Sequence, residues 1–376
     1  MKIIIKILAV ICASLAVVCA VLVVFSSRID PRGSITEDHA QYKNVILLIG
    51  DGMGQNTLKT ALAEDSIPLF MQTLPVHGES KTNSWPGFIL TDSAAGAVAL
   101  ASGVRTTNGM LGRYALDPRG WFAQAESLSG AALKRGCSAG VVTTDSTSGA
   151  TPTAFSGYSH SRDEEQEISE SQLVSGLNLI WGGASDSVTK ENAKAGGFEY
   201  IDNKTDWNKL TSAVRSFAQF NRDDLAGTLN TQTTPTLEEM TVKAIDLLDD
   251  NSRGFFLMVE GAHIDKFAHA NEKDPMVHHV REFDKAVKAA MDYAGAHPDT
   301  LILVTADHET GGITLKDGKY EFTSGGHTKA NVPVYVNRAD AGFENGGTWK
   351  NREIGAQLGR VFGFGSDEFP VPVKPR

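Results

Sequence analysis

Short apolar segments that recur along the chain constrain its fold more than any other sequence feature. They read VILLIG, AGVVTT, LNLIWGG, FFLMVEG and LILVTADH, at residues 45–50, 139–144, 177–183, 255–261 and 301–308. Each is nearly continuous in apolar character and ends in polar or glycine-rich residues. That pattern is typical of strands that are buried on both faces of a sheet.

Helical patterns lie between these segments. In TPTLEEMTVKAIDLL, Thr236 and Glu239 are spaced as a capping box, and the apolar residues that follow share one helix face. A second helix is predicted over roughly Met276–Tyr293. The alternation of strand and helix predicts an α/β fold, a three-layer α/β/α sandwich around a central, mostly parallel sheet.

The N-terminal residues form a separate segment. An apolar run over residues 7–25 follows Lys2 and Lys6 and is interrupted only by Ser14. A membrane span needs roughly 20 apolar residues, whereas the core of a cleaved signal has about 7–15. The run therefore favours an uncleaved anchor, although VCA at residues 18–20 leaves cleavage open.

This segment divides the chain into three expected parts. They are a signal anchor or transmembrane helix at residues 1–27, a juxtamembrane spacer at 28–43 and a catalytic domain at 44–376. The lysines before the run predict that the rest lies on the periplasmic or cell-surface side of the cytoplasmic membrane, or is secreted after cleavage. The formal net charge of −10 argues against recognition of nucleic acid.

Potential metal ligands follow three of the apolar segments. They are carboxylates and histidines: Asp51, Glu260, Asp265, His269, Asp307, His308 and, in a later glycine-rich loop, His327. Ligands of open α/β sheets bind beyond the carboxyl ends of the strands. Carboxylates with histidines suit Zn²⁺, and carboxylates with a hydroxyl and waters suit Mg²⁺. Each could alone be a helix cap, a buried histidine or a surface pair, but together they favour a polynuclear metal site.

The stretch TDSAAGAVALASG at residues 91–103 places Ser93 before a helix of small residues. Alone, such a serine is most often an N-cap. At a helix N-terminus beside metal ions it can instead be a nucleophile, because a metal lowers the pKa of a hydroxyl without a histidine base. The alanines would let the helix pack closely on the sheet, and Ser102 is expected to be structural.

Six motifs, taken in order, resemble the alkaline phosphatase family: NVILLIGDGMG, TDSAAGAVALASG, ATPTAFSGYSHSR, VEGAHIDKFAH, VTADHETGG and GGHT. The resemblance covers residues 44–336. It implies hydrolysis of small phosphate monoesters to an alcohol and inorganic phosphate, through a phosphoserine on Ser93 and with a broad substrate range. It also allows a homodimer. The short stretch between His308 and His327 predicts minimal insertions.

The resemblance implies three metal ions. The ligands of a first Zn²⁺, which would activate the attacking water, are Asp265, His269 and His327. The ligands of a second Zn²⁺, which would activate Ser93, are Asp51, Asp307 and His308. The ligands of a Mg²⁺ are Glu260, Thr151 and the shared Asp51.

Two cations are expected to face the phosphate. Arg162, in HSR, would clamp two phosphate oxygens with its planar guanidinium, although alone it reads as a surface charge. Lys266 would add positive charge near the phosphate, and alone it reads as an exposed lysine. Both roles are implied by the resemblance.

One position departs from the family pattern. Two residues before the Thr or Ser of the Mg²⁺ site the family commonly has Asp or His, and this chain has Gly149. Glycine supplies neither a ligand nor a partner for Lys266. The third site is therefore weaker, rearranged or completed by waters, and Asp145 or Ser148 is a candidate substitute.

Three other kinds of protein would share part of this pattern. A phosphodiesterase or phosphonate hydrolase of the same superfamily would keep the metal ligands, but the surroundings of Ser93 and the presence of Arg162 favour a monoesterase. A sulfatase needs Pro and Arg after the nucleophile, which are absent here. A phosphate- or metal-binding protein without turnover would need the ligands and not Ser93.

Overall fold

The computed structural model describes residues 42–115, 122–227, 232–365 and 369–370. Within these ranges no helix has the length and apolar character needed to cross a membrane. The expected anchor at residues 1–27 and nearly all of the expected spacer lie outside the described residues. Membrane attachment therefore stays a prediction.

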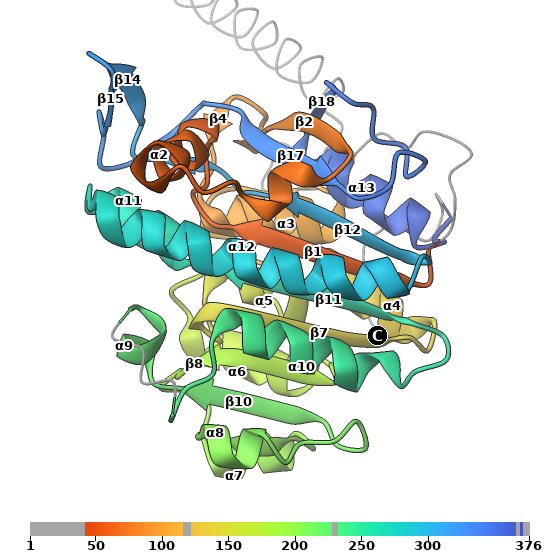
Figure 1. Ribbon diagram of the computed structural model, residues 1–376. Helices are drawn as coiled ribbons and strands as arrows, with labels where there is room; N and C mark the ends of the chain where they lie inside the picture. Colours follow the sequence, from red (N-terminus) through yellow and green to blue (C-terminus); the bar gives the residue numbers. More distant parts are fainter. Residues whose placement is uncertain (1–41, 116–121, 228–231, 366–368, 371–376) are drawn as a thin grey trace, which may run out of the picture.

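A ten-stranded sheet forms the centre of the fold (Figure 1). Its strands, in spatial order, are β18 (Thr348–Lys350), β2 (Val76–Lys81), β17 (Val332–Val336), β12 (Thr300–Thr305), β1 (Asn44–Gly50), β11 (Phe255–Gly261), β7 (Ser138–Ser146), β8 (Leu179–Gly183), β10 (Ser216–Phe220) and β9 (Glu199–Ile201). All neighbours are parallel except β17, which is antiparallel to both β12 and β2. The predicted mostly parallel sheet is confirmed.

Strand β1 lies inside this sheet and is fully buried. It pairs in parallel with β11 on one side and with β12 on the other. Val45, Leu47 and Ile49 enter the core on one face, and Ile46 and Leu48 enter the core on the opposite face. Because successive side chains of a strand point to opposite faces, two apolar faces require a continuous apolar run.

Helices cover both faces of the sheet, which gives the predicted three layers (Figure 1). The longer helices of one face are α2 (Gln55–Asp65), α10 (Leu237–Asp249), α11 (His263–His269) and α12 (Lys273–Ala296). Those of the other face are α3 (Ser93–Ser102), α4 (Leu128–Lys134), α5 (Ala150–Ser156), α6 (Glu165–Leu173) and α13 (Asn351–Val361).

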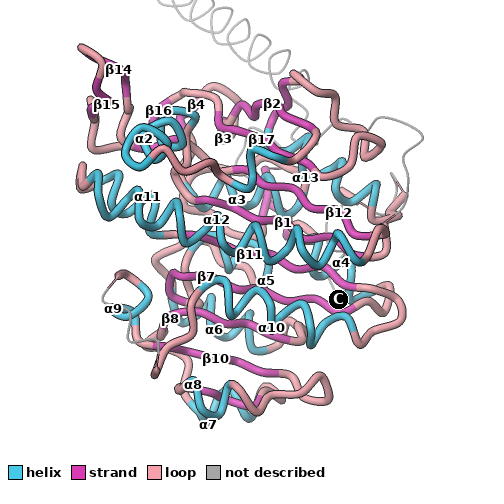
Figure 2. The backbone as a smooth tube through the Cα atoms, in the orientation of Figure 1, coloured by secondary structure: helices cyan, strands magenta, loops and turns pink. Residues whose placement is uncertain are grey.

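Short elements complete the connections. The helical ones are η1 (Phe70–Thr73), α7 (Lys190–Ala195), α8 (Lys204–Trp207) and α9 (Arg222–Leu225). The short strands are β3 (Asn83–Ser84), β4 (Ile89–Leu90), β5 (Arg113–Ala115), β6 (Phe122–Gln124), β13 (Glu309–Thr310), β14 (Thr314–Lys316), β15 (Lys319–Glu321) and β16 (His327–Thr328). Between β13 and β16 the chain makes only the β14–β15 hairpin, which projects from the fold (Figure 2). This agrees with the predicted minimal insertion.

Several sequence-predicted boundaries need correction. The capping box of Thr236 and Glu239 is present at the start of α10. The helix predicted over Met276–Tyr293 extends over Lys273–Ala296, because its first turn is polar and accepts a proline without loss of a helical hydrogen bond. Strand β8 begins at Leu179, two residues later than the apolar run. Strand β12 ends at Thr305, so the metal-ligand candidates after it lie in a loop.

Helix α3 is buried along its whole length. It packs between the sheet and α13, and the two helices approach so closely that their backbones are in contact. A Cβ atom on Gly355 of α13 would lie 2.5 Å from the carbonyl oxygens of Ala99 and Leu100. The small residues of α3 are therefore packing residues, as the sequence predicted.

We expect Gly355→Ala to destabilise the fold by about 1–3 kcal/mol, because the added methyl must force α3 and α13 apart. Gly295→Ala is the matched control. Gly295 also lies in a helix, and a Cβ there would meet nothing within 4 Å. Its replacement should be neutral or stabilising by up to about 1 kcal/mol. Urea unfolding measures both variants, and equal midpoints for the two would contradict the close helix contact.

Candidate active site

The candidate ligands come together because β1, β11 and β12 are neighbours and run in the same direction. Asp51 directly follows β1. Strand β11 leads into α11, which carries Asp265 and His269 one helical turn apart. Strand β12 is followed by Asp307 and His308. The carboxyl ends of adjacent parallel strands meet at one edge, which is where such sheets bind ligands.

The loop after β1 needs glycine at position 52. Gly52 has a φ of +70°, a conformation that other residues rarely adopt. A Cβ there would also lie 2.8 Å from the Cα of Asp265, and the Gly52 amide donates to Asp307 Oδ1 at 3.2 Å. The glycine thus lets the loop after β1 approach both α11 and Asp307.

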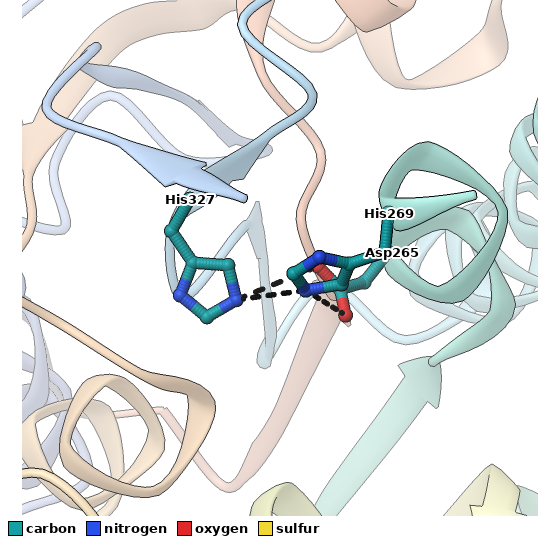
Figure 3. A group of neighbouring side chains, drawn as sticks. All are labelled: Asp265, His269 and His327. Carbon is teal, nitrogen blue, oxygen red and sulfur yellow. Dashed lines mark hydrogen bonds and ion pairs between the residues drawn. The ribbon is translucent and has the colours of Figure 1, made fainter. Parts of the chain in front are cut away.

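Among the described residues, two groups of side chains have ligand atoms that all lie within 4.8 Å of one another. The first is Asp265, His269 and His327, whose side chains converge on one point (Figure 3). His269 Nε2 lies 3.4 Å from Asp265 Oδ2 and 3.1 Å from His327 Nε2. The side chain of His269 is 39% exposed, so this group is open to solvent and to a substrate.

The second group is Asp51, Asp307 and His308, and all three are buried. His308 Nε2 lies 3.1 Å from Asp307 Oδ2 and 3.5 Å from Asp51 Oδ1. These two carboxylate oxygens find no hydrogen-bond partner among the described residues. Buried oxygens without donors are costly unless a cation binds them. The rings of His308 and His327 stack with centroids 3.6 Å apart, so the two groups adjoin.

The three imidazoles are held with Nε2 facing the cluster. His269 Nδ1 donates to the carbonyl of Gly325 at 2.7 Å, and His327 Nδ1 donates to that of Thr91 at 2.9 Å. Because a carbonyl only accepts, each Nε2 keeps its lone pair for a metal. Such outer partners fix the tautomer and the ring orientation of metal-binding histidines.

Thr310 is a site residue that the sequence reasoning missed. Its hydroxyl donates to Asp265 Oδ1 and lies 3.2 Å from His308 Nδ1, so it connects the two ligand groups. It belongs to the quoted motif VTADHETGG, but a lone threonine beside stronger ligands gave no separate signal.

Burial and mutual repulsion set the protonation of this site. Burial raises the pKa of Asp51 well above its usual range, and the charges of Asp307 and Asp265 add to the effect. Burial and the charge of Asp265 raise the pKa of Asp307 to about 6. Burial, reinforced by His327, holds the pKa of His308 well below its usual value, so its imidazole is neutral and available as a ligand.

Glu260 and Thr151 form the edge of the cluster towards β7. Burial raises the pKa of Glu260 to about 8, Asp145 adds to this, and the hydroxyls of Thr143 and Thr151 oppose it. Thr143 donates to Glu260 Oε2, a contact for which the apolar run AGVVTT gave no signal. The buried hydroxyl of Thr151 finds no partner at hydrogen-bond geometry among the described residues.

Ser93 is the first residue of α3 and not its N-cap. Asp92 is the cap, and its carboxylate accepts from the Ala95 amide at 2.9 Å. The stretch taken alone predicted Ser93 as the N-cap, and the structure corrects this because the Asp92 carboxylate takes that role. Ser93 is thereby free to reach the second ligand group, where its Oγ lies 3.1 Å from His308 Nε2.

The two predicted cations lie beside this cluster. Arg162 Nη1 is 3.5 Å from Asp92 Oδ2, and the Arg162 side chain is 37% exposed. Its charge contributes to the lowered pKa of His308, which places it near the ligands. Lys266 Nζ donates to Asp145. The structure thus brings the Ser93 hydroxyl and Arg162 to the candidate metal groups, and it pairs Lys266 with Asp145.

The donor set fits metal ions. Carboxylates combined with neutral imidazoles, in two adjoining groups, match the ligands of Zn²⁺ and related transition metals. The unpartnered oxygens of Asp51 and Asp307 are aimed at the point where a cation would neutralise them. A hydroxyl within reach of such ions, with cations at the rim, suits chemistry on an anionic group.

Comparison with known proteins agrees with this geometry. A family model described as alkaline phosphatase matches residues 42–180 and 176–338. The chain is 34% identical over 311 residues to alkaline phosphatase 4 of Bacillus subtilis, covering 74% of this chain and 64% of that protein. It is 30% identical over 345 residues to the alkaline phosphatase of Escherichia coli, covering 74% and 72%. The chain thus spans slightly less than two thirds of the first of these relatives.

A solved structure is similar over nearly the whole fold. The alkaline phosphatase of the Antarctic bacterium TAB5 superimposes with a TM-score of 0.73 and 28% identity, covering 88% of this chain and 100% of that one. These matches agree with the six sequence motifs, with the sheet and with the two ligand groups. The chain belongs to the alkaline phosphatase family.

Proposed function

We propose that this protein hydrolyses phosphate monoesters to an alcohol and inorganic phosphate, with Ser93 as the nucleophile. One observation carries the proposal. Ser93 Oγ lies 3.1 Å from His308 Nε2, the same nitrogen that faces the unpartnered oxygens of Asp51 and Asp307. A hydroxyl in that position belongs to the ligand cluster. A hydroxyl that capped the helix would instead bond to a backbone amide of the first helical turn.

We assign two Zn²⁺ to the two ligand groups and one Mg²⁺ to Asp51, Glu260 and Thr151. Bound ions would lower the pKa of the Ser93 hydroxyl and neutralise charge on the phosphate oxygens. For a relative, a variant of the TAB5 enzyme with glutamate in place of a histidine was solved with Mg bound in its M3 site. That precedent supports a Mg²⁺ site in this chain.

The reaction then needs two displacements at phosphorus. Ser93 Oγ loses its proton and bonds to phosphorus while the ester P–O bond breaks and the alcohol leaves with a proton. Water next bonds to phosphorus and the P–Oγ bond breaks, which returns Ser93 and releases phosphate. Arg162 holds two phosphate oxygens through both steps, and Lys266 adds positive charge beside them.

The substrate range proposed is broad. Among the described residues, only the β14–β15 hairpin and the glycine-rich loop lie between β13 and β16. His269 and Arg162 are partly exposed, so the leaving group can point to solvent. Location outside the cytoplasmic membrane, anchoring through residues 1–27 and a homodimer stay predictions.

The direct test uses the purified protein with an aryl phosphate monoester and the matching diester. We expect monoester hydrolysis that a chelator abolishes and that Zn²⁺ with Mg²⁺ restores. A preference for the diester would favour the phosphodiesterase alternative. Metal binding without hydrolysis of either ester would favour a binding protein.

Replacement of Ser93 separates catalysis from packing. We expect Ser93→Ala to lower kcat/KM by about 10³-fold or more, since the covalent route is lost. Ser102→Ala is the matched control, because Ser102 is a buried serine of the same helix whose hydroxyl has no hydrogen-bond partner within the described part of the chain. It should retain wild-type kinetics. Hydrolysis at the wild-type rate by Ser93→Ala would remove the phosphoserine from the mechanism.

Arg162 is expected to contribute to catalysis by donating two parallel hydrogen bonds to phosphate oxygens. Arg162→Ala should lower kcat/KM by about 10–100-fold, which corresponds to loss of one or two charge-assisted hydrogen bonds. Arg162→Lys should recover only part of this, because an ammonium cannot bind two oxygens in a fixed plane. Steady-state kinetics and inhibition by inorganic phosphate measure both variants. Equal recovery by lysine would argue against a bidentate clamp.

The metal-free protein should lose stability as the pH rises from about 6.5 to 8. The folded chain keeps a proton on Glu260 up to a pKa of about 8, whereas the unfolded chain releases it near 4.5. The folded state therefore binds more protons, and its free energy of unfolding falls with pH. Histidines with lowered pKa values, such as His308, act in the opposite direction, but only below their usual 6.5.

Chemical unfolding of chelator-treated protein across this pH range tests the prediction. The decrease attributable to Glu260 is at most about 2 kcal/mol over 1.5 pH units. Glu260→Gln should reduce the dependence and leave the part that comes from Asp51, whose pKa is also raised. Saturating Zn²⁺ and Mg²⁺ should reverse it, because the ions bind the ionised carboxylates. The same slope in the wild type and in Glu260→Gln would contradict the assignment.

A further inference from the structure

The surroundings of Gly149 leave no space for a side chain at that position. Gly149 is the N-cap of α5, and its backbone conformation is one that any residue can adopt. A Cβ at this position would lie 2.6 Å from Asp145 Oδ2 and 2.9 Å from the carbonyl oxygen of Ser146. The space into which a side chain at position 149 would extend is therefore already occupied by the carboxylate of Asp145.

Asp145 is held firmly in this place. Its Oδ1 accepts from the amide of Ser146 at 2.8 Å and from Nζ of Lys266. Its own amide donates at 2.8 Å to the hydroxyl of Thr143, and that hydroxyl donates to Glu260. A single hydroxyl thus fixes Asp145 relative to the carboxylate that is the expected Mg²⁺ ligand.

Ser148 does not fill the same role. Its hydroxyl donates to Glu165 Oε1 at 3.1 Å and lies 2.9 Å from Ser146 Oγ. Glu165 also accepts from Ser185 and from the amide of Asp186, so this network lies towards α6. Of the two residues that the sequence offered as substitutes, only Asp145 contacts Lys266.

We propose that Asp145 supplies the carboxylate that position 149 lacks: it orients Lys266 and completes the Mg²⁺ site of Glu260 and Thr151. The inference rests on the proposed function, since it concerns the third metal of the same site. The Asp145 carboxylate reaches the site from the end of β7, four residues earlier in the chain than position 149. Glycine at position 149 makes this possible, because a Cβ there would collide with the carboxylate. Asp145 is a positioning residue, since it acts on substrate only through Lys266 and the metal.

The test measures Mg²⁺ binding directly. Protein stripped with chelator and reloaded with Zn²⁺ is titrated with Mg²⁺ by isothermal calorimetry. Asp145→Asn keeps the size of the side chain and removes its charge, and we expect it to weaken Mg²⁺ binding by about 10–100-fold. Ser148→Ala is the matched control and should bind Mg²⁺ as the wild type does. Wild-type affinity in Asp145→Asn would overturn the proposal.

Two further variants test whether a side chain at position 149 and the carboxylate of Asp145 compete for the same space. Gly149→Ala should weaken Mg²⁺ binding, because its methyl displaces Asp145. The double variant Asp145→Ala/Gly149→Asp moves the carboxylate to the position that the family commonly uses, after a small shift at the Ser146 carbonyl. It should bind Mg²⁺ more tightly than Asp145→Ala alone, by about tenfold. If Asp145→Ala/Gly149→Asp and Asp145→Ala bind Mg²⁺ with equal affinity and unfold at the same urea concentration, a carboxylate at position 149 does not replace that of Asp145.

The binding readout also separates this inference from the proposed function. A wild-type protein that binds Mg²⁺ and cleaves no monoester would refute the phosphatase assignment. Loss of Mg²⁺ binding in Asp145→Asn under those conditions would still support the role of Asp145. Unchanged Mg²⁺ binding in Asp145→Asn, with monoester hydrolysis intact in the wild type, would refute the role of Asp145 alone.

Discussion

Repulsion among four carboxylates at one edge of the sheet is the interaction on which the site depends. Asp51, Glu260, Asp265 and Asp307 are buried there because β1, β11 and β12 are adjacent and parallel. Buried charges without partners cost several kcal/mol each, so the metal-free site keeps protons or remains strained. The neutral imidazoles beside these carboxylates carry no charge and cannot offset the repulsion. Bound cations can offset it. Metal binding and stability of the fold are thus coupled.

Ser93, the proposed nucleophile, reaches this cluster through close packing. Helix α3 has side chains small enough to lie against both the sheet and α13, and its first residue is Ser93. Asp92 caps the helix, and its carboxylate also accepts from the amide of Gly109 and contacts Arg162. One carboxylate therefore fixes the start of the helix and contacts Arg162. A shift of α3 would change both positions at once.

Much of this was predictable from sequence, for identifiable reasons. Strands buried on both faces leave continuous apolar runs, and ligands at strand ends leave polar residues directly after them. The edge strand β18 and its neighbour β2 escaped notice because their residues are partly exposed and leave no such run. Thr310 and Asp145 could not be assigned from spacing, because their roles depend on contacts across the fold. The choice between Asp92 and Ser93 as helix cap depends on local backbone geometry.

The strand order of the sheet has a consequence for biosynthesis. Val45 of β1 is paired with Phe256 on one side and with Leu301 on the other, so β1 waits for two neighbours that are synthesised much later. His327 and helix α13 follow later still. Because chains emerge from the N-terminus, neither ligand group can be complete while residues 45–250 alone have been synthesised. Any metal ion that binds these groups must therefore be acquired late, when most of the residues that form the sheet have already emerged.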